Sequence, residues 1–461
     1  MTATTVAVIG GGIAGLAAAD AIASTGVGVT LVEGSRQIGG KLRTCEVGGV
    51  VVDEGAEAFL VRRPEAADLV ASLGLDAGLV SPQTMRAAVW ARGELRPMPA
   101  RTVMGLPSDV AALRGVLSAA EVARARADAW LPGEPPGEDI AVGLWARRRF
   151  GSAVVDRLLD PMLGGVYAGR ADELSLAATL PQVPRTERSA LRAVRRAIVA
   201  GPPSDQPVFA TLRDGLGTLP GALAASLARH GGEIAVGSPV RGLSRTTDGW
   251  RVVHGATNAE QALDVAAVVV ATPASPAGRL LAADVPAAAR ELAAIDAASL
   301  AIVTTAWRAA DGGRADISGY LVPAIAGRPV KAVTLSSAKW PHLSGREVVV
   351  ARCSFGRHGD AAVLQRDDDD LVADAVAELT AYAGFAGQPI DAKVSRWGGA
   401  LPQYAVGHLD RVARIRTAVA EQPGLAVCGA TYQGVGVPAC IASARAAAEQ
   451  VSGYLRSRAA Q

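Results

Sequence analysis

Four short apolar runs along the chain predict buried strands of a parallel sheet. They are Val6–Ile9, Val29–Val32, Ala266–Ala271 and Leu425–Cys428. Each run is continuous rather than alternating, as expected where helices cover both faces of a sheet. The segment Ile13–Ser24, between the first two runs, predicts a helix. Because the runs come from both ends and the middle of the chain, they predict a discontinuous domain.

Alternation of apolar and polar residues marks a second group of strands. The segments Glu233–Val236, Pro239–Ser244 and Trp250–His254 show this period of two. Since they follow one another at short intervals, we expect them to form a small β-meander.

Capping signals predict several helices elsewhere. Ser118–Glu121 has the spacing of a capping box, and Asp139–Arg149 predicts a helix headed by its aspartate. The acidic run Asp367–Asp370 suits the positive end of a helix better than a calcium site, because a helical pattern follows it. Pro438 suits the first turn of a closing helix, which would point its positive end at a bound cofactor.

A glycine-rich turn joins the first strand to the first helix. Gly10, Gly12 and Gly15 have GxGxxG spacing, and Glu33 follows the second strand. The glycines permit a tight turn, close approach of a pyrophosphate and close packing of the helix, while the helix N-terminus attracts phosphate. A carboxylate at the end of the second strand accepts hydrogen bonds from a ribose. The pattern therefore predicts a dinucleotide site.

The next loop indicates which dinucleotide is bound. The stretch RQIGGKLR contains Gly39, Gly40 and Lys41 between two arginines. Paired glycines with basic residues suit a loop that crosses the diphosphate of a longer cofactor, and the stretch resembles the FAD signature of the flavin amine oxidase superfamily. The alternative is an ordinary glycine turn with solvated basic side chains.

Composition excludes several other classes of function. Of 461 residues half are hydrophobic, and the net charge of +2 gives no general case for nucleic acid binding. The five histidines and four cysteines lack the spacing of metal ligands, so we expect no metal and reduced cysteines. No strongly apolar stretch of about 18 residues occurs, and no cleavable leader is recognised, so a cytoplasmic location is expected.

Several longer segments of the chain resemble those of one protein family. They are GGGIAGL at Gly10, DEGAEAFLVRRP at Asp53, LRPMPARTVMGLP at Leu95, LLDPMLGGVYAGRADELS at Leu158, KWPH at Lys339, RWGGALPQYAVGHLDRV at Arg396 and GATYQGVGVPACI at Gly429. Over nearly its whole length the chain resembles the FAD-dependent protoporphyrinogen/coproporphyrinogen oxidase family, and most closely its bacterial coproporphyrinogen III oxidase type.

The resemblance implies a set of site residues. Those expected to contact FAD are Gly10, Gly11, Gly12, Ile13, Ala14, Gly15, Glu33, Gly34, Gly40, Lys41, Gly55, Ala56, Glu57, Ala58, Val240, Trp397, Gly429, Val435, Gly436 and Val437. Those expected to contact the substrate are Arg63, Val166, Tyr167, Ala168 and Gly169. Arg63 would hold a propionate, since guanidinium can bind carboxylate in a bidentate way. The alternative for Tyr167 is a core aromatic residue.

The resemblance also implies the chemistry. A porphyrinogen loses six electrons in three two-electron steps, each a hydride transfer to flavin N5, and O2 takes the electrons to give hydrogen peroxide. No catalytic side chain is assigned, because the cofactor carries the redox chemistry. Coproporphyrinogen III is the expected substrate, with protoporphyrinogen IX as the alternative. A flavin desaturase or amine oxidase, and a non-catalytic carrier of the same fold as in GDP-dissociation inhibitors, remain further alternatives.

Partners follow from the same resemblance. A ferrochelatase that takes the product is a candidate transient partner, and the protein is expected to be a monomer or homodimer. The basic helix predicted over Thr186–Val199 is expected to be a surface helix or a mobile loop, with peripheral contact to an anionic membrane as the alternative.

The expected fold is α/β, or α+β overall. It has a Rossmann-type FAD-binding domain of the amine oxidase/p-hydroxybenzoate hydroxylase-like kind, a mixed-sheet substrate domain and a helical insertion. We assign residues 1–82, 210–275 and 395–461 to the FAD-binding domain. Residues 83–105 and 276–394 form the substrate-binding domain, and 106–209 the helical domain, which is the part expected to face a membrane if any does.

Overall fold

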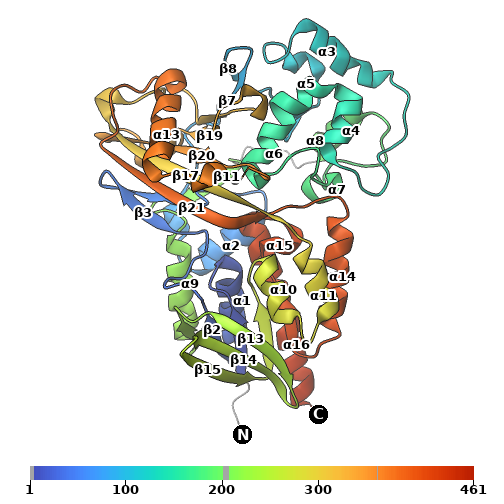
Figure 1. Cartoon of the computed structure of the whole chain (residues 1–461), viewed down its shortest axis with the longest axis vertical. Coiled ribbons are helices and arrows are strands. Elements are labelled where there is room, and N and C mark those ends of the chain that lie inside the picture. Colours follow the sequence, from blue (N-terminus) through green and yellow to red (C-terminus); the bar gives the residue numbers. More distant parts are fainter. Residues whose placement is uncertain (1–4, 201–206, 361, 461) are drawn as a thin grey trace.

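The structure is a computed structural model that describes residues 5–200, 207–360 and 362–460 (Figure 1). A five-stranded parallel sheet lies in the lower half of the molecule in this view. Its strands, in order, are β12 (Glu233–Ala235), β2 (Gly28–Val32), β1 (Thr5–Ile9), β16 (Ala267–Val270) and β22 (Leu425–Val427). The four apolar runs are thus confirmed as strands of one sheet.

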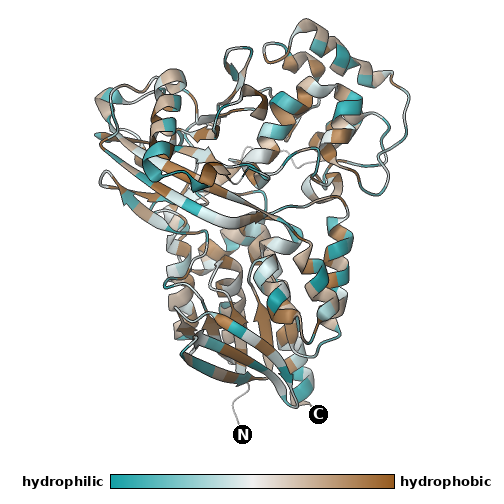
Figure 2. Ribbon diagram, viewed as in Figure 1, coloured by the Kyte–Doolittle hydropathy of each residue, from teal (hydrophilic) through white to brown (hydrophobic). Residues whose placement is uncertain are grey.

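Both faces of this sheet are buried, which explains why its strands do not alternate. On one face Val6 and Val8 pack against α1 (Ile13–Ala23), α9 (Thr218–Arg229) and α16 (Val437–Ala459). On the other face Ala7 and Ile9 pack against the elements β13 (Val240–Thr246), β14 (Gly249–Ala256), β15 (Ala259–Val265), α10 (Ala274–Leu281), α11 (Pro286–Ala293) and α14 (His408–Ala420). Figure 2 shows hydrophobic residues along these enclosed strands.

The predicted meander is wrong in one strand. Glu233–Ala235 forms β12, which pairs in parallel with β2 at the edge of the main sheet. The meander consists of β13, β14 and β15 instead, so its third strand is Ala259–Val265. Pairing with a strand about 200 residues earlier in the chain is invisible to local alternation.

A seven-stranded mixed sheet occupies the upper left of Figure 1. Its order is β21 (Asp391–Pro402), β17 (Ala297–Arg308), β20 (Val348–Phe355), β19 (Val330–Thr334), β18 (Gly319–Leu321), β7 (Ala87–Ala91) and β8 (Glu94–Pro97). The helix α13 (Asp368–Ala383) covers one face. Asp367 is the N-cap residue of α13, although its side chain makes no capping hydrogen bond, so the acidic run lies at a helix start as predicted.

A helical part occupies the upper right of Figure 1. Its elements α3 (Ala119–Arg126), α4 (Val142–Phe150), α6 (Asp160–Tyr167) and α8 (Ala190–Ala200) share one core. The capping box of Ser118 and Glu121 is confirmed. The helix predicted from Asp139 begins at Val142 instead. The Asp139 carboxylate accepts hydrogen bonds from Ser175 and Gly407, so it joins distant segments rather than capping α4.

The basic helix predicted over Thr186–Val199 is α8. Leu191 and Val194 are buried in the core of the helical part. The apolar face of α8 therefore packs inward and is not free to enter a membrane. None of the described helices is both long enough and apolar enough to cross a membrane.

The remaining elements connect these parts. They are β3 (Thr44–Val47), β4 (Val50–Asp53), β5 (Phe59–Leu60), α2 (Pro64–Ser72), β6 (Leu79–Val80), β9 (Thr102–Val103), β10 (Leu106–Pro107), α5 (Ser152–Val154), α7 (Leu176–Thr179), β11 (Phe209–Leu212), α12 (Ser336–Lys339) and α15 (Ala430–Gln433). The fold class is the expected mixture of α/β and α+β architecture. The predicted boundary between residues 394 and 395 falls inside β21, and α10 and α11 pack on the parallel sheet. The division into three domains stays a prediction.

Candidate functional site

The glycine turn between β1 and α1 has the geometry that a bound pyrophosphate needs. Gly10 has a φ of +111°, and a Cβ on Gly15 would lie 1.8 Å from the Gly10 carbonyl oxygen. A Cβ on Gly12 would meet no atom of the described chain within 4 Å, so the backbone is open there. Gly10 and Gly15 are thus required by packing, whereas Gly12 leaves room for a ligand at the helix N-terminus.

Glu33 holds this turn from the end of β2. Its Oε2 accepts a hydrogen bond from the Gly11 amide at 2.6 Å, and its Oε1 accepts one from the Ser35 amide at 2.7 Å. Each carboxylate oxygen has a second lone pair, so a ribose diol can still bind. The Glu33 carbonyl accepts from Ser238, which brings Gly34 and the half-buried Val240 to the same end of the sheet.

Two further loops lie beside the glycine turn. Gly39 donates to the Gly11 carbonyl at 2.7 Å, and a Cβ on Gly40 would lie 3.2 Å from the Gly12 Cα. Lys41 accepts a hydrogen bond from Ala56 through its carbonyl oxygen, at 3.2 Å. Burial lowers the pKa of the Lys41 amine. A nearby anion would offset that burial cost, as the diphosphate of FAD would.

The loop of residues 54–58 is half-buried and packs on this second loop. A Cβ on Gly55 would lie 2.2 Å from the Lys41 carbonyl oxygen and 3.3 Å from the Trp397 ring. The indole N–H of Trp397 donates to the Glu54 carbonyl at 3.3 Å. The structure therefore brings Gly55, Ala56, Glu57 and Ala58 together with Trp397, although about 340 residues separate them in the chain.

The C-terminal loop closes the same site. The Gly429 amide donates to Ser443, and a Cβ on Gly429 would lie 3.9 Å from the Ala14 Cβ. The Tyr404 hydroxyl donates to the Ala430 carbonyl at 2.5 Å and accepts from the Gly434 amide at 2.7 Å. Val435, Gly436 and Val437 follow this clamped loop at the start of α16. A Cβ on Gly434 would lie 3.7 Å from the Arg63 guanidinium, which places the exposed Arg63 at the rim of this loop.

The predicted substrate segment ends α6. Val166 is 41% exposed, whereas Tyr167 is buried, with its ring 5.5 Å from that of Tyr404. Ala168 is left-handed with φ 50°, and its carbonyl accepts from the His358 amide at 2.6 Å. A Cβ on Gly169 would lie 2.3 Å from the Gln403 amide oxygen. Burial raises the pKa of Tyr167 to about 12, so this phenol stays neutral and is unsuited to act as a base.

An open face of the mixed sheet lies between these two regions. The row Ser395, Ile302, Ser354, Ala332 and Leu321 crosses five neighbouring strands on the face opposite α13. All five residues are only half-buried, although the paired residues on the α13 face, such as Val303 and Cys353, are fully buried. This half-exposed face of a central sheet, with two serines and an alanine among its five residues, is a candidate floor for a binding site.

A predicted site segment lies at each end of this row of residues. At one end Trp397, two residues along β21 from Ser395, packs against Gly55. At the other end a Cβ on Gly165 of α6 would lie 3.7 Å from the Leu321 side chain, next to the exposed Val166. We call this row of five residues the open floor. It connects the predicted flavin loop with the predicted substrate segment.

Sequence reasoning missed several residues of this region. The open floor was missed because its members alternate with core residues on five separate strands. Tyr404 and Ser443 were not selected because their role is to hold backbone amides. Lys339 lies in the KWPH segment but was not assigned to the site, and Arg352 gave no local signal; both bind Glu57. Within the described residues, no group of three or more His, Cys, Asp or Glu side chains is arranged to hold a metal ion.

Comparison with known proteins agrees with this geometry. The family model described as flavin containing amine oxidoreductase matches residues 13–452. The coproporphyrinogen III oxidase of Mycobacterium tuberculosis is 38% identical over 100% of both chains, and that of Bacillus subtilis is 32% identical over 98% of both. The protoporphyrinogen oxidase of Bos taurus is 30% identical over 97% of this chain and 98% of its own.

Solved structures show the same fold. A protein from Exiguobacterium sp. assigned as a protoporphyrinogen oxidase superposes with a TM-score of 0.85 and 29% identity, over 99% of this chain and 100% of its own. Reduced UDP-galactopyranose mutase shares the fold at a TM-score of 0.75 and 14% identity, over 98% and 94%. The glycine cradle, Glu33 and the adjoining loops fit a flavin dinucleotide. The chain therefore belongs to the flavin containing amine oxidoreductase family, and FAD is its cofactor.

Proposed function

We propose that this protein oxidises coproporphyrinogen III to coproporphyrin III, with O2 as the final electron acceptor. The support is the full-length similarity to proteins named coproporphyrinogen III oxidase in several bacteria. FAD, when bound, supplies a two-electron acceptor for each of the three oxidation steps. The side chains of the protein then bind, orient and shield the macrocycle.

The open floor is the observation that carries the proposal. A porphyrinogen is a broad macrocycle, and it needs a wide surface with small side chains beside the flavin. Ser395, Ile302, Ser354 and Ala332 offer such a surface between Gly55 and α6. Val166 is 41% exposed and follows Gly165, which lies next to Leu321 of the floor, and Arg63 lies at the rim of the C-terminal loop. We propose that Val166 to Gly169 bound the macrocycle and that Arg63 binds a propionate.

For the cofactor, we propose that the glycine turn and Lys41 hold the diphosphate and that Glu33 binds the ribose. Gly34 and Val240 would lie toward the adenine. The loop of Gly55 to Ala58, together with Trp397, would face the isoalloxazine ring. The loop from Gly429 and the start of α16 at Val437 would cover its other end, where the positive end of that helix favours the reduced, anionic flavin.

Oxidation of protoporphyrinogen IX is the second candidate. The similarity to the Bos taurus protoporphyrinogen oxidase, at 30% identity over nearly the whole chain, favours it. The two substrates differ in charge, because coproporphyrinogen III carries four propionates and protoporphyrinogen IX carries two. The Mycobacterium tuberculosis and Bacillus subtilis relatives are more similar, at 38% and 32% identity, so we keep coproporphyrinogen III as the primary substrate.

Filling the open floor tests the proposed place of the macrocycle. Ser354→Phe puts a ring on the half-exposed face of β20, at a position paired with Ile302 and Ala332. We expect the oxidation rate of coproporphyrinogen III to fall at least 100-fold while the FAD content stays that of the wild type. Ser244→Phe on the exposed side of β13 is the matched control. A Ser354→Phe variant with a wild-type rate would show that the macrocycle binds elsewhere.

We further propose that the protein works in the cytoplasm and passes its product to a ferrochelatase. Any peripheral membrane contact would use exposed side chains such as Trp130 and Val199, which are 75% and 79% exposed. The apolar face of α8 is unsuited to this role because Leu191 and Val194 are buried.

A further inference from the structure

A buried group of charges underlies the loop of residues 54–58. The Glu57 carboxylate accepts from the Lys339 amine at 2.6 Å and from the Arg352 guanidinium at 2.6 Å. Burial alone would raise the pKa of Glu57, but the charges of Lys339 and Arg352 lower it to about 2. We call Glu57, Lys339 and Arg352 the Glu57 cluster. Its carboxylate is ionised throughout the physiological range.

Arg352 does more in this cluster than neutralise a charge. Its second terminal nitrogen donates to the Gly55 carbonyl at 2.6 Å and to the Glu54 carbonyl at 3.4 Å. The Lys339 amine, by contrast, donates to only the Glu57 carboxylate among the described residues, and it lies over the Trp340 ring. Arg352 is 7% exposed, so these bonds form away from water. A buried guanidinium with this fork fixes both the side chain of Glu57 and the backbone that precedes it.

The position of Arg352 on β20 shows where in the fold these hydrogen bonds lie. Arg352 pairs across the sheet with Thr304 and Thr334, in the row next to the open floor, and Ser354 follows it on the same face. The loop of residues 54–58 contacts Arg352, whereas Ser354 in the next row is half-buried. Arg352 therefore fixes the loop at the border between the flavin region and the floor.

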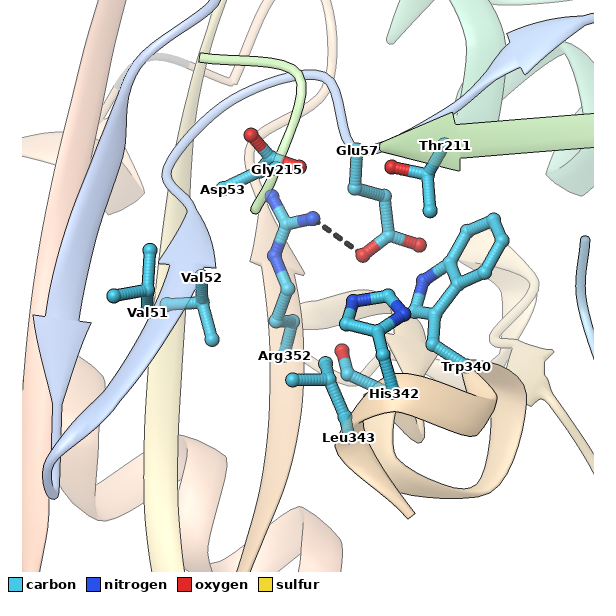
Figure 3. A pocket seen from close by; sticks show the side chains of 11 residues that line it. Val51, Val52, Asp53, Glu57, Thr211, Gly215, Trp340, His342, Leu343 and Arg352 are labelled. Atoms are coloured by element: carbon cyan, nitrogen blue, oxygen red, sulfur yellow. Dashed lines mark hydrogen bonds and ion pairs between the residues drawn. The ribbon is translucent and has the colours of Figure 1, made fainter. Parts of the chain in front are cut away.

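The surroundings of the guanidinium are polar. Figure 3 shows Arg352 pointing toward Glu57, with Asp53 and His342 nearby. A cavity of about 20 Å³, enough for one water molecule, is lined by Arg352, Ser336 and His342. Arg352 Nε, Ser336 Oγ and His342 Nδ1 are buried without a hydrogen-bond partner among the described residues. One water there would satisfy these groups and leave the fork of Arg352 aimed at the loop.

We propose that Arg352 is a positioning residue for the flavin: its fork holds the carbonyls of Glu54 and Gly55 and the carboxylate of Glu57, and so fixes the loop beneath the isoalloxazine ring. The proposal rests on the proposed contact of Gly55 to Ala58 with the flavin. It is independent of which porphyrinogen is the substrate. The loop residues that Arg352 binds lie about 295 residues away in the chain.

The experiment compares Arg352→Gln with a buried arginine of the helical part. Arg149 is also 7% exposed, and it too binds a carboxylate and carbonyls, those of Asp128 and Leu131. Arg149→Gln is therefore a matched control for the loss of a buried ion pair far from the flavin. For each variant we would measure the FAD dissociation constant of the apoprotein, the visible spectrum and reduction potential of the bound flavin, and the unfolding temperature.

We expect Arg352→Gln to raise the FAD dissociation constant at least tenfold and to shift the spectrum and potential of the bound flavin. Arg149→Gln should lower the unfolding temperature and leave the FAD constant within twofold of wild type. Arg352→Lys keeps the charge but lacks the fork, so it should recover less than half of the loss in binding energy.

Three results would overturn the proposal. One is an Arg352→Gln protein with wild-type FAD affinity, spectrum and potential. Another is an equal effect of Arg149→Gln on FAD affinity, which would reveal a purely structural role. The third is full recovery in Arg352→Lys. If Arg352→Gln does not fold, Arg352→Lys and Glu57→Gln take its place, and wild-type flavin properties in both would overturn the proposal. Because none of these readouts uses a porphyrinogen, failure here is separate from failure of the proposed reaction.

Discussion

At the scale of single residues, two neighbouring carboxylates have opposite environments. Glu57 is held ionised by Lys339 and Arg352, with its pKa lowered to about 2 against the effect of burial. Asp53, four residues earlier, is 7% exposed and forms no ion pair among the described residues, although the charge of Arg352 acts to lower its pKa. Burial raises the pKa of Asp53 to about 6, although the amides of Leu216 and Gly217 donate to it. Ionisation of Asp53 therefore costs stability near neutral pH.

The first prediction concerns Asp53→Asn. In the unfolded chain Asp53 releases its proton near pH 4, but in the folded chain it does so near pH 6. Between these values the folded state binds more protons, so its stability falls as pH rises through this window. The Asp53→Asn variant has no carboxyl group to titrate at this position, so its stability does not fall for this reason. We expect the stability of the variant relative to wild type to rise between pH 4 and pH 6, by up to about 3 kcal/mol, and then to stay level.

Thermal unfolding of the FAD-loaded proteins between pH 4.5 and 8 measures this difference. Comparing the change with pH removes the constant cost of replacing a carboxylate by an amide at Leu216 and Gly217. A difference between variant and wild type that does not change with pH would mean that Asp53 titrates as in the unfolded chain. The Glu57 cluster contributes the opposite slope only at the acid end, because the pKa of Glu57 is about 2.

At the scale of elements, two glycines of the β1–α1 turn have different physical roles. Gly15 packs against the Gly10 carbonyl, and a side chain there collides with backbone. Gly12 has an ordinary φ of −74° and open space at its Cβ, so the fold itself does not require glycine. Only a ligand at the N-terminus of α1 gives a reason for glycine at this position.

The second prediction therefore pairs Gly12→Ala with Gly15→Ala. We expect the Gly12→Ala apoprotein to unfold within about 2 °C of wild type, while its FAD dissociation constant rises at least tenfold, about 1.4 kcal/mol. Gly15→Ala should lower both the stability and the FAD affinity, because the Gly10 turn must move. Apoprotein unfolding and FAD titration check both variants. Gly12→Ala with wild-type FAD affinity would place the pyrophosphate elsewhere.

Elements defined by local pattern were predictable from sequence, and those defined by distant pairing were not. The strand, turn and helix from Thr5 to Ala23 follow one another, so their apolar run and glycines indicated them directly. By contrast, Glu233–Ala235 was placed in the wrong sheet because its partner β2 is distant in the chain. The start of α4 was wrong because Asp139 binds Ser175 and Gly407.

The residues of the candidate site show the same contrast between those that the sequence revealed and those that it did not. The glycine turn and Glu33 lie within 24 residues of one another and were found from spacing. The open floor and Arg352 come from strands whose order along the sheet does not follow the sequence. The function of a small half-exposed residue such as Ala332 cannot be predicted from its own sequence neighbours. It becomes apparent only from the residues beside it on the neighbouring strands.

At the scale of the whole molecule, the proposed site lies where three parts of the chain meet. The parallel sheet supplies the dinucleotide cradle, the mixed sheet supplies the floor, and α6 of the helical part closes it (Figure 1). Hydrogen bonds across these parts keep them in place, including those from Gln403 to Tyr167 and from His358 to Ala168.

The most direct test of the central claim is an aerobic assay of the purified, FAD-loaded protein that follows porphyrin fluorescence. Coproporphyrinogen III and protoporphyrinogen IX are supplied in separate reactions, and hydrogen peroxide is measured alongside. We expect much faster turnover of coproporphyrinogen III than of protoporphyrinogen IX, with three molecules of hydrogen peroxide formed for each porphyrin. Faster turnover of protoporphyrinogen IX would contradict the choice of substrate, and no turnover of either by a flavin-loaded protein would contradict the proposed reaction.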